Sequence, residues 1–280
     1  MRTIHAKTVA AQVKQMCLDA NYILGTDVVQ ALKRSLSEET SPAGKRVLEH
    51  LLDNARISQK GEYPLCQDTG FAVFFVEMGS RLQLKGGTIQ DAIDEGVRQA
   101  YREGFLRKSI VLDPLRRNNS QDNTPAVVWL DMIPGDQLCI HMAPKGGGSE
   151  NMSQIGMLTP SQGREGVIDF VVKMVSEAGG NPCPPIIVGV GIGGTFEKAA
   201  WLAKKSLMRP LDDRHDDPFY AELEQEMLRR INDLGIGPMG FGGRTTALDV
   251  HIEVYPCHIA SLPVAVNIQC HSARHKSAYL

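Results

Sequence analysis

Apolar residues recur at helical spacing through the first part of the chain. They mark one face of residues 9–23, then of 28–36, and then of 47–55, which is the pattern of amphipathic helices. Ser41-Pro42 supplies a cap and a first-turn proline for the third helix. The segment up to about Lys60 is therefore predicted to form a helical layer.

Strand-forming runs follow this layer. A short aromatic strand is predicted over Phe71 to Val76, and a helix capped by Thr88 comes after it. The runs Ala126 to Met132 and Gln137 to Met142 flank Ile133-Pro-Gly-Asp136. Proline and glycine between two β-prone runs favour a turn, so this region is predicted to be a hairpin.

The second half of the chain mixes both periodicities. A buried helix is predicted around residues 167–175 and a polar helix from Pro218 to about Leu234. Apolar and polar residues alternate from Leu248 to Val254, which indicates a strand with one buried face. A further strand is predicted over residues 262–268. With no repeat or low-complexity linker, the pattern indicates one compact α+β unit, in which helices surround an antiparallel or mixed sheet.

Composition excludes several classes of protein. With 280 residues, 42% of them apolar, the chain can bury a large core, so disorder is not its dominant state. The net charge of -2 provides no field for phosphate backbones or anionic lipid. No apolar run has the length of a membrane span, and Met1-Arg-Thr-Ile-His-Ala lacks the apolar core of a signal peptide. We therefore expect a cytoplasmic protein with neither nucleic acid nor membrane as a partner.

The six cysteines are too sparse for a disulfide scaffold, so reduced thiols are expected. Cys66, Cys183 and Cys270 fall at the ends of predicted elements, among glycine, proline and polar residues. Cys17 and Cys139 lie on a helix face and in a strand, where a cysteine serves as a small hydrophobic residue. Cys257 fits either class.

The three loop cysteines are too far apart in sequence to form a local metal knuckle. They could converge in the fold on an iron–sulfur cluster, and three thiolates would leave one iron open. An open iron is a Lewis acid that can take a hydroxyl and a carboxylate oxygen of a substrate. Inert buried thiols are the alternative that spacing alone favours.

Two glycine-rich segments are candidate anion sites. Lys145-Gly-Gly-Gly-Ser-Glu-Asn151 can present backbone amides and a cationic side chain to a carboxylate or phosphate, or can be a flexible turn. Gly189-Val-Gly-Ile-Gly-Gly-Thr195 fits the GxGxxG pattern, but an acidic ribose partner does not clearly follow it. A tight packing of helix on strand is the favoured role, and a nucleotide-binding module is the alternative function of another class.

Several polar residues beside these segments are candidates for substrate chemistry. Gln67 and Asp68 could orient a substrate or a proton, although an Asp before a glycine turn is more often a local cap. His258 could donate a proton or be structural. Three arginines, namely Arg107, Arg244 and Arg274, are candidate carboxylate forks or solvated surface charges.

Five motifs taken together resemble one enzyme family. They are Cys66-Gln-Asp-Thr-Gly70, Lys145-Gly-Gly-Gly-Ser-Glu-Asn151, Asn181-Pro-Cys-Pro-Pro185, Gly191-Ile-Gly-Gly-Thr195 and Asn267-Ile-Gln-Cys-His-Ser-Ala-Arg274. Their order and spacing are similar to those of the iron–sulfur hydro-lyases of the class I fumarase and tartrate dehydratase family, over most of the chain. The resemblance makes the cluster the favoured reading of the three loop cysteines.

The resemblance implies a role for each motif residue. Cys66, Cys183 and Cys270 would hold a [4Fe-4S] cluster whose fourth iron binds the substrate. Asp68 and His258 would be catalytic, and Gln67, Arg107 and Gly147 would bind substrate; the motif around Arg107 is short. Such enzymes add or remove water across a carbon–carbon double bond of a small dicarboxylate, and cationic and amide donors absorb the charge that develops.

The family also implies a partner. Single-chain members continue into a carboxy-terminal domain that carries the proposed proton-abstracting residue. This sequence stops at Leu280, so residues 1–280 resemble the α subunit of a hetero-oligomer, with the base supplied by a separate β subunit. Fumarate hydration to malate is the expected reaction, and dehydration of L-tartrate is the alternative.

Overall fold

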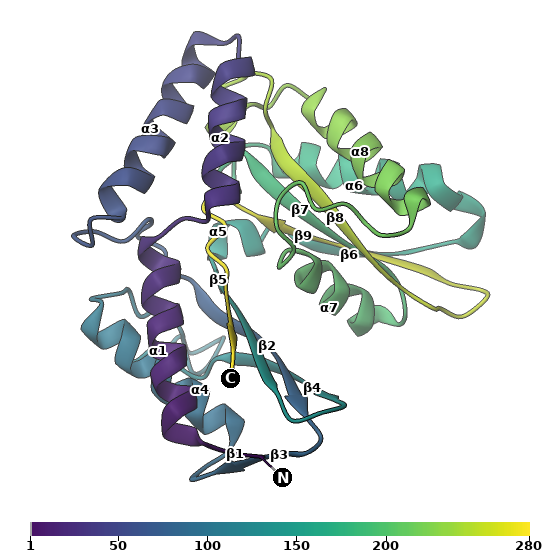
Figure 1. The fold of residues 1–280 in the computed structure, drawn as a ribbon. Coiled ribbons are helices and arrows are strands. Elements are labelled where there is room, and N and C mark those ends of the chain that lie inside the picture. Colours follow the sequence, from purple (N-terminus) through teal and green to yellow (C-terminus); the bar gives the residue numbers. More distant parts are fainter. Residues whose placement is uncertain (1) are drawn as a thin grey trace. The chain divides into compact units, whose positions relative to one another are not determined.

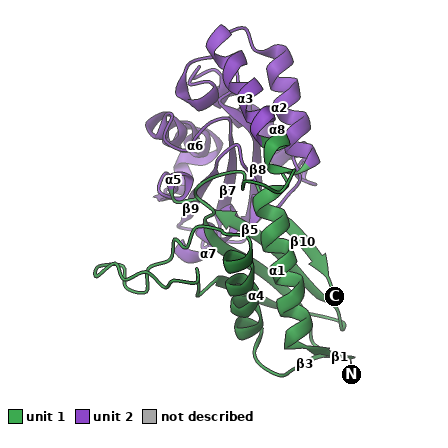
Figure 2. Ribbon diagram, turned by 90° about the vertical axis from the view of Figure 1, so that its left-hand side faces the viewer, with its two compact units in different colours: residues 1–25, 55–147, 274–280 green, residues 26–54, 148–273 purple. Residues whose placement is uncertain are grey.

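The computed structural model describes residues 2–280. Contacts group these residues into two compact units, whereas the sequence pattern indicates one (Figure 2). Unit 1 consists of residues 1–25, 55–147 and 274–280, and unit 2 of residues 26–54 and 148–273. Each unit is described by itself. The predicted α+β class is confirmed, since helices pack on mixed sheets in both units (Figure 1).

Unit 1 is a four-stranded sheet with two helices on one face. The helices are α1 (Ala6–Tyr22) and α4 (Ile89–Glu103), which pack against each other. Unit 1 also has a separate two-stranded sheet. The strands of both sheets are β1 (Arg2–His5), β2 (Phe71–Gly79), β3 (Leu82–Lys85), β4 (Val127–Ile133), β5 (Leu138–Lys145) and β10 (Lys276–Tyr279). The sheet order is β10-β5-β2-β4, and β1 pairs separately with β3.

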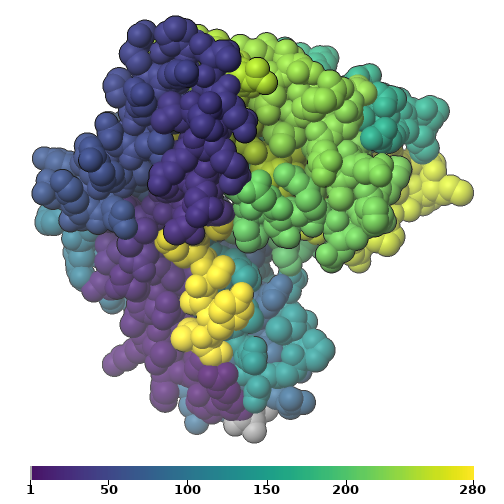
Figure 3. All heavy atoms as spheres, turned by 45° about the horizontal axis from the view of Figure 1, so that its top comes forward, coloured from purple at the N-terminus to yellow at the C-terminus, as the bar shows by residue number. Residues whose placement is uncertain are grey.

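The core of unit 1 follows from the predicted periodicity. Val13 of α1, Val97 of α4 and Phe74 of β2 belong to one buried cluster. Thr88 caps α4 as predicted, because its side chain accepts from the Asp91 N–H and the Asp91 carboxylate accepts from the Thr88 N–H. In the space-filling view, the yellow C-terminal strip that contains β10 lies beside the purple α1 (Figure 3).

The hairpin predicted around Ile133-Pro-Gly-Asp136 is wrong. β4 and β5 do not pair with each other, because β2 lies between them, parallel to β4 and antiparallel to β5. The connecting loop crosses the end of β2, where the Gly79 N–H donates to the Gln137 carbonyl oxygen at 2.8 Å. A Cβ on Gly79 would lie 2.7 Å from the backbone of Asp136. A glycine distant in sequence therefore admits the crossing.

Unit 2 contains a second four-stranded sheet, ordered β6-β9-β7-β8. Its strands are β6 (Gln154–Leu158), β7 (Ile186–Gly193), β8 (Ala247–Tyr255) and β9 (Leu262–Gln269). Its helices are α2 (Thr26–Glu38), α3 (Pro42–Ser58, which continues into unit 1), α5 (Gly147–Glu150, which begins in unit 1), α6 (Gly163–Ala178), α7 (Phe196–Ser206) and α8 (Pro218–Asn232), with 3-10 turns η1 (Pro160–Gln162) and η2 (Pro238–Gly240).

The two faces of this sheet carry different helices. Val188 and Val190 of β7 share a buried cluster with residues of α6 and α8. The intervening Gly189 and Gly191 face α7, where a Cβ would lie 2.1 Å from the carbonyl oxygens of Ala203 and Ala199 respectively. These glycines lie within a buried strand and allow α7 to approach it. This is the packing role that the sequence favoured over a nucleotide loop.

Two further observations complete the fold. The alternating strand β8 forms as predicted, but its polar residues Asp249 and His251 are fully buried, so the expected single buried face is wrong at these positions. Among the helices of residues 2–280, none has both the length and the apolar character needed to cross a bilayer.

Candidate active site

The loop that carries Cys66 in unit 1 is organised around the Asp68 carboxylate. Its Oδ1 accepts from the Gly70 N–H at 3.1 Å, which is the local cap that the sequence allowed. Its Oδ2 accepts from the Gly147 N–H at 2.7 Å. Cys66 and Asp68 are half-buried, and the Gln67 side chain is exposed. Asp68 therefore joins two motifs that lie far apart in sequence.

Glycine is needed where these two motifs meet. Gly70 has φ +78°, and a Cβ there would lie 2.8 Å from the backbone of Lys145. β5 brings Lys145 into this position, opposite Phe71 of β2. The Gly147 amide donates to the carboxylate of Asp68, and the binding of a substrate anion by this glycine-rich loop stays a prediction.

The three candidate arginines differ in their surroundings. Arg107 is exposed, and its carbonyl oxygen accepts from the Thr69 hydroxyl at 2.8 Å, so its guanidinium can reach a soluble anion. Arg244 is exposed, and its N–H donates to Glu39 at 2.8 Å. Arg274 is only 2% exposed and donates to the Asp68 carbonyl oxygen at 2.9 Å. Arg274 is thus neither a surface charge nor a fork open to solvent.

Unit 2 brings Cys183 together with the segment that carries Cys270. The carbonyl oxygen of Cys183 accepts from the His271 N–H at 3.4 Å, and the Nδ1 atom of His271 lies 3.0 Å from that oxygen. Cys183 has φ +58°, a backbone region that costs energy for any residue except glycine. Other non-glycine residues of the chain, among them Asn123 and Met239, share this positive φ.

Polar contacts join further motif residues in unit 2. Glu150 forms an ion pair with Lys204 of α7, and its Oε2 accepts from the Asn267 side chain at 3.2 Å. The Ile268 N–H donates to the Ser153 hydroxyl at 3.2 Å. The Ser-Glu-Asn part of one motif and the Asn-Ile-Gln part of another are therefore held next to each other.

His258 lies apart from these contacts, in the loop between β8 and β9. Its side chain is exposed, and its Nδ1 accepts from the Ala260 N–H at 3.2 Å. It lines a largely apolar cavity of about 360 Å³ in unit 2, together with Arg164, Phe219, Tyr220 and Cys257. The imidazole is therefore accessible to a ligand.

The thiols separate as the sequence predicts. None of the six cysteines forms a disulfide. Burial raises the pKa of the Cys17 thiol far above its ordinary value, and burial followed by the charge of Glu77 raises the pKa of Cys139. These two thiols are buried, whereas Cys66, Cys183 and Cys270 are half-buried and Cys257 is exposed. Within residues 2–280, no three His, Cys, Asp or Glu side chains form a ready metal-binding group.

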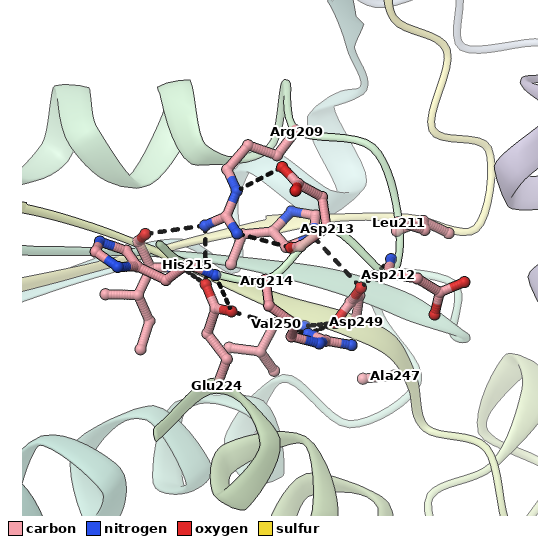
Figure 4. Close-up of polar contacts among 12 residues, drawn as sticks. Arg209, Leu211, Asp212, Asp213, Arg214, His215, Glu224, Ala247, Asp249 and Val250 are labelled. Carbon is pink, nitrogen blue, oxygen red and sulfur yellow. Dashed lines mark hydrogen bonds and ion pairs between the residues drawn. The ribbon is translucent and has the colours of Figure 1, made fainter. Parts of the chain in front are cut away.

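A buried ion network in unit 2 was missed at the sequence level (Figure 4). Arg209 donates to Glu224 at 2.8 Å, and Arg214 pairs with Asp249 at 2.5 Å; both carboxylates are fully buried. Burial alone would raise the pKa of Asp249, but His251, Arg214 and the Asp212 N–H lower it to about 2. The charged residues in the alternating strand were the sequence signal that could have indicated this network. The network fixes residues 209–214 onto α8 and β8.

The family model for fumarate hydratase (Fumerase) matches residues 10–279. The chain belongs to the fumarate hydratase (Fumerase) family. It is 43% identical over 268 residues to the putative L(+)-tartrate dehydratase subunit alpha of Methanocaldococcus jannaschii, covering 94% of each chain. It is 38% identical over 252 residues to the L(+)-tartrate dehydratase subunit alpha of Escherichia coli K12, covering 89% of this chain and 82% of the relative. The subunit of the same name in Shigella sonnei matches equally well.

Membership of the fumarate hydratase family confirms the resemblance drawn from the five motifs. The site residues assigned from that resemblance stay predictions. Sequence reasoning missed the buried polar residues that hold the Cys66 loop, namely Asn21, Tyr101 and Asn123. Each of them lies in a segment whose pattern indicates only a helix face or a loop, so no local signal pointed to them.

Proposed function

We propose that this chain is the cluster-bearing α subunit of an iron–sulfur hydro-lyase, and that it removes water from L-tartrate in complex with a β subunit. The observation that carries the proposal is the match to tartrate dehydratase α subunits over nearly the whole chain. Fumarate, the substrate expected from sequence, is the second candidate, supported by the family model. A cytoplasmic hetero-oligomer is part of the proposal.

The donor set of the chain fits a [4Fe-4S] cluster with one open iron. Cys66, Cys183 and Cys270 form no disulfide and are half-buried, as thiolate ligands reachable by a substrate must be. Cys17 and Cys139 are removed from consideration by their burial. A cluster bound by the three thiolates would supply a Lewis acid that polarises the departing hydroxyl.

The remaining site residues would act on the dicarboxylate itself. The exposed side chains of Gln67 and Arg107 can bind carboxylate oxygens, and the guanidinium offers two parallel donors. Asp68 holds the Gly147 amide at 2.7 Å, so a substrate carboxylate that takes this amide must displace Asp68. The displaced carboxylate is then available for proton transfer. The main proton-abstracting group is expected on the β subunit.

The test is turnover by the complex of this chain with its β subunit, assembled anaerobically with iron and sulfide. We expect L-tartrate to give the highest kcat/KM, compared with fumarate and malate. A preference for fumarate would return the assignment to the substrate expected from sequence. A colourless complex without bound iron would reject the hydro-lyase proposal altogether.

Single Cys→Ser variants test which cysteines hold the cluster. Replacement of Cys66, Cys183 or Cys270 should each remove most of the bound iron and the visible absorbance. Cys257→Ser is the matched control, since Cys257 is a free thiol exposed on unit 2, and it should retain the iron of the parent. Equal iron in all four variants would contradict the ligand assignment.

A further inference from the structure

The loop that carries Cys66 is held through three consecutive backbone carbonyls. The Asp68 carbonyl oxygen accepts from Arg274 at 2.9 Å. The Thr69 carbonyl oxygen accepts from the Tyr101 hydroxyl at 2.7 Å, and the Gly70 carbonyl oxygen accepts from the Asn123 side chain at 3.2 Å. The three donor side chains are at most 2% exposed. All of these groups lie within unit 1.

Arg274 also ties the start of the loop to helix α1. Its Nη1 donates to the Asn21 side-chain oxygen at 3.0 Å, and the Asn21 side-chain nitrogen donates to the Cys17 carbonyl oxygen at 2.9 Å. The backbone carbonyl of Asn21 accepts from the Leu65 N–H at 2.8 Å. One buried pair, Arg274 with Asn21, therefore holds the chain on both sides of Cys66.

The charge of Arg274 sets this pair apart from ordinary packing. Burying a guanidinium costs several kcal/mol unless it gains a counter-charge. Within residues 2–280, Arg274 donates to the side-chain oxygen of Asn21 and the carbonyl oxygen of Asp68, which are both neutral, and its buried Nε has no hydrogen-bond partner. A positive charge kept in this position favours an anionic group at the adjoining loop. Three thiolates around a [4Fe-4S] core carry a net negative charge.

We propose that Arg274 is a positioning residue, which fixes the Cys66 loop to α1 through the Asp68 carbonyl and Asn21 and so sets the geometry of the Cys66 ligand. The proposal rests on the proposed function for the role of Cys66. The hydrogen-bonded fork itself is independent of any cofactor. Arg274→Lys keeps the charge and loses the fork, whereas Arg274→Gln loses the charge, so the two variants separate the contributions.

The first measurement is hydrogen exchange of the full-length, cluster-free chain, followed on peptides that cover residues 64–70. Both variants should exchange about tenfold faster than the parent there, since the loop opens locally when its restraints are removed. Arg209→Lys is the matched control, because Arg209 is a half-buried arginine that donates to a backbone carbonyl, that of Ile252, in unit 2. It should leave residues 64–70 unchanged. Unchanged exchange in both Arg274 variants would overturn the proposal.

The second measurement uses the reconstituted complex with its β subunit. Loss of iron to a chelator should be about 10- to 100-fold faster in the Arg274 variants, which is the usual effect of removing support from a metal ligand. Arg274→Lys should be closer to the parent than Arg274→Gln. The electron paramagnetic resonance spectrum of the one-electron-reduced cluster should also change, whereas Arg209→Lys should preserve it. Parental iron loss and spectra in both variants would overturn the positioning role.

The two proposals fail in different ways. If the parent complex binds no iron but the Arg274 variants still loosen residues 64–70, the proposed function is rejected and the restraint of the loop by Arg274 is confirmed. If the parent binds iron and turns over substrate while the variants exchange, lose iron and react as the parent does, the positioning role is rejected and the proposed function stands.

Discussion

At the scale of single residues, Asp249 shows how a buried charge is tolerated. It has no exposed surface, yet it contacts His251 at 3.4 Å, pairs with Arg214 and accepts from the Asp212 N–H at 2.8 Å. Together these partners overcome burial and lower its pKa from 3.8 to about 2. The folded protein therefore stabilises the ionised form of Asp249 relative to the unfolded chain.

Because folding lowers the pKa of Asp249, the free energy of unfolding depends on pH in the acid range. The stabilising contribution of Asp249 is fully present above its unfolded pKa near 4 and is lost as the pH falls toward 2. Asp249→Asn should lower the free energy of unfolding by about 2 kcal/mol at pH 7, with a difference that shrinks below pH 4. Urea unfolding of both proteins at several pH values measures this difference in the free energy of unfolding.

Asp233→Asn is the control for this series. Asp233 also pairs with an arginine, at 2.8 Å from Arg229, but its side chain is 64% exposed, and exposed pairs contribute little. It should change stability by less than about 0.5 kcal/mol. An Asp249 effect that is small and constant from pH 7 to pH 3 would contradict the assigned coupling.

At the scale of elements, periodicity predicted the strands but not their partners. The helices α1, α2, α3, α4, α6 and α8 and the strands β2, β8 and β9 were all expected from the sequence. The hairpin prediction was wrong because proline and glycine indicate only a local turn. Which strand lies between β4 and β5 depends on Gly79, far away in sequence, which lets the loop pass close to the end of β2. Similarly, the motifs marked Thr69 and Cys183, but their partners, Tyr101 and His271, make contacts that only the fold reveals.

Close approach of α7 to β7 gives a prediction at this scale. Gly191→Ala would place a Cβ 2.1 Å from the Ala199 carbonyl oxygen, and backbone on both sides leaves little room for relaxation. We expect a loss of about 3 kcal/mol in the free energy of unfolding. Gly86→Ala is the control, because that site has open space but φ +85°, so it should lose only about 1 kcal/mol. Equal losses would contradict the packing role.

At the scale of the whole molecule, the two units are interleaved in sequence. Residues 274–280 return to unit 1 after the 126 residues of 148–273 have built most of unit 2. β10 then pairs with β5 along Lys276–Tyr279, and Leu280 exchanges two backbone hydrogen bonds with Leu138, at 2.8 and 2.9 Å. Neither unit is a continuous stretch of sequence, so composition and linkers could not reveal them.

Deleting residues 276–280 should therefore weaken unit 1. The change removes an edge strand and uncovers the side of the core that Ala278 closes. We expect the melting temperature to fall by about 5 °C or more, measured by calorimetry. Tyr279→Thr is the control, since the Tyr279 side chain is 72% exposed on the same strand, and it should melt close to the parent. An unchanged melting temperature after the deletion would show that β10 adds nothing to the sheet.

The late return of residue 274 has a consequence for biosynthesis. During most of translation the nascent polypeptide contains Cys66 but not Arg274, which follows more than 200 residues later and donates a hydrogen bond to the loop of Cys66. The loop lacks this restraint until that codon has been read and its product has left the exit tunnel. The fully restrained form of the loop is therefore reached only after residues 1–274 have been synthesised.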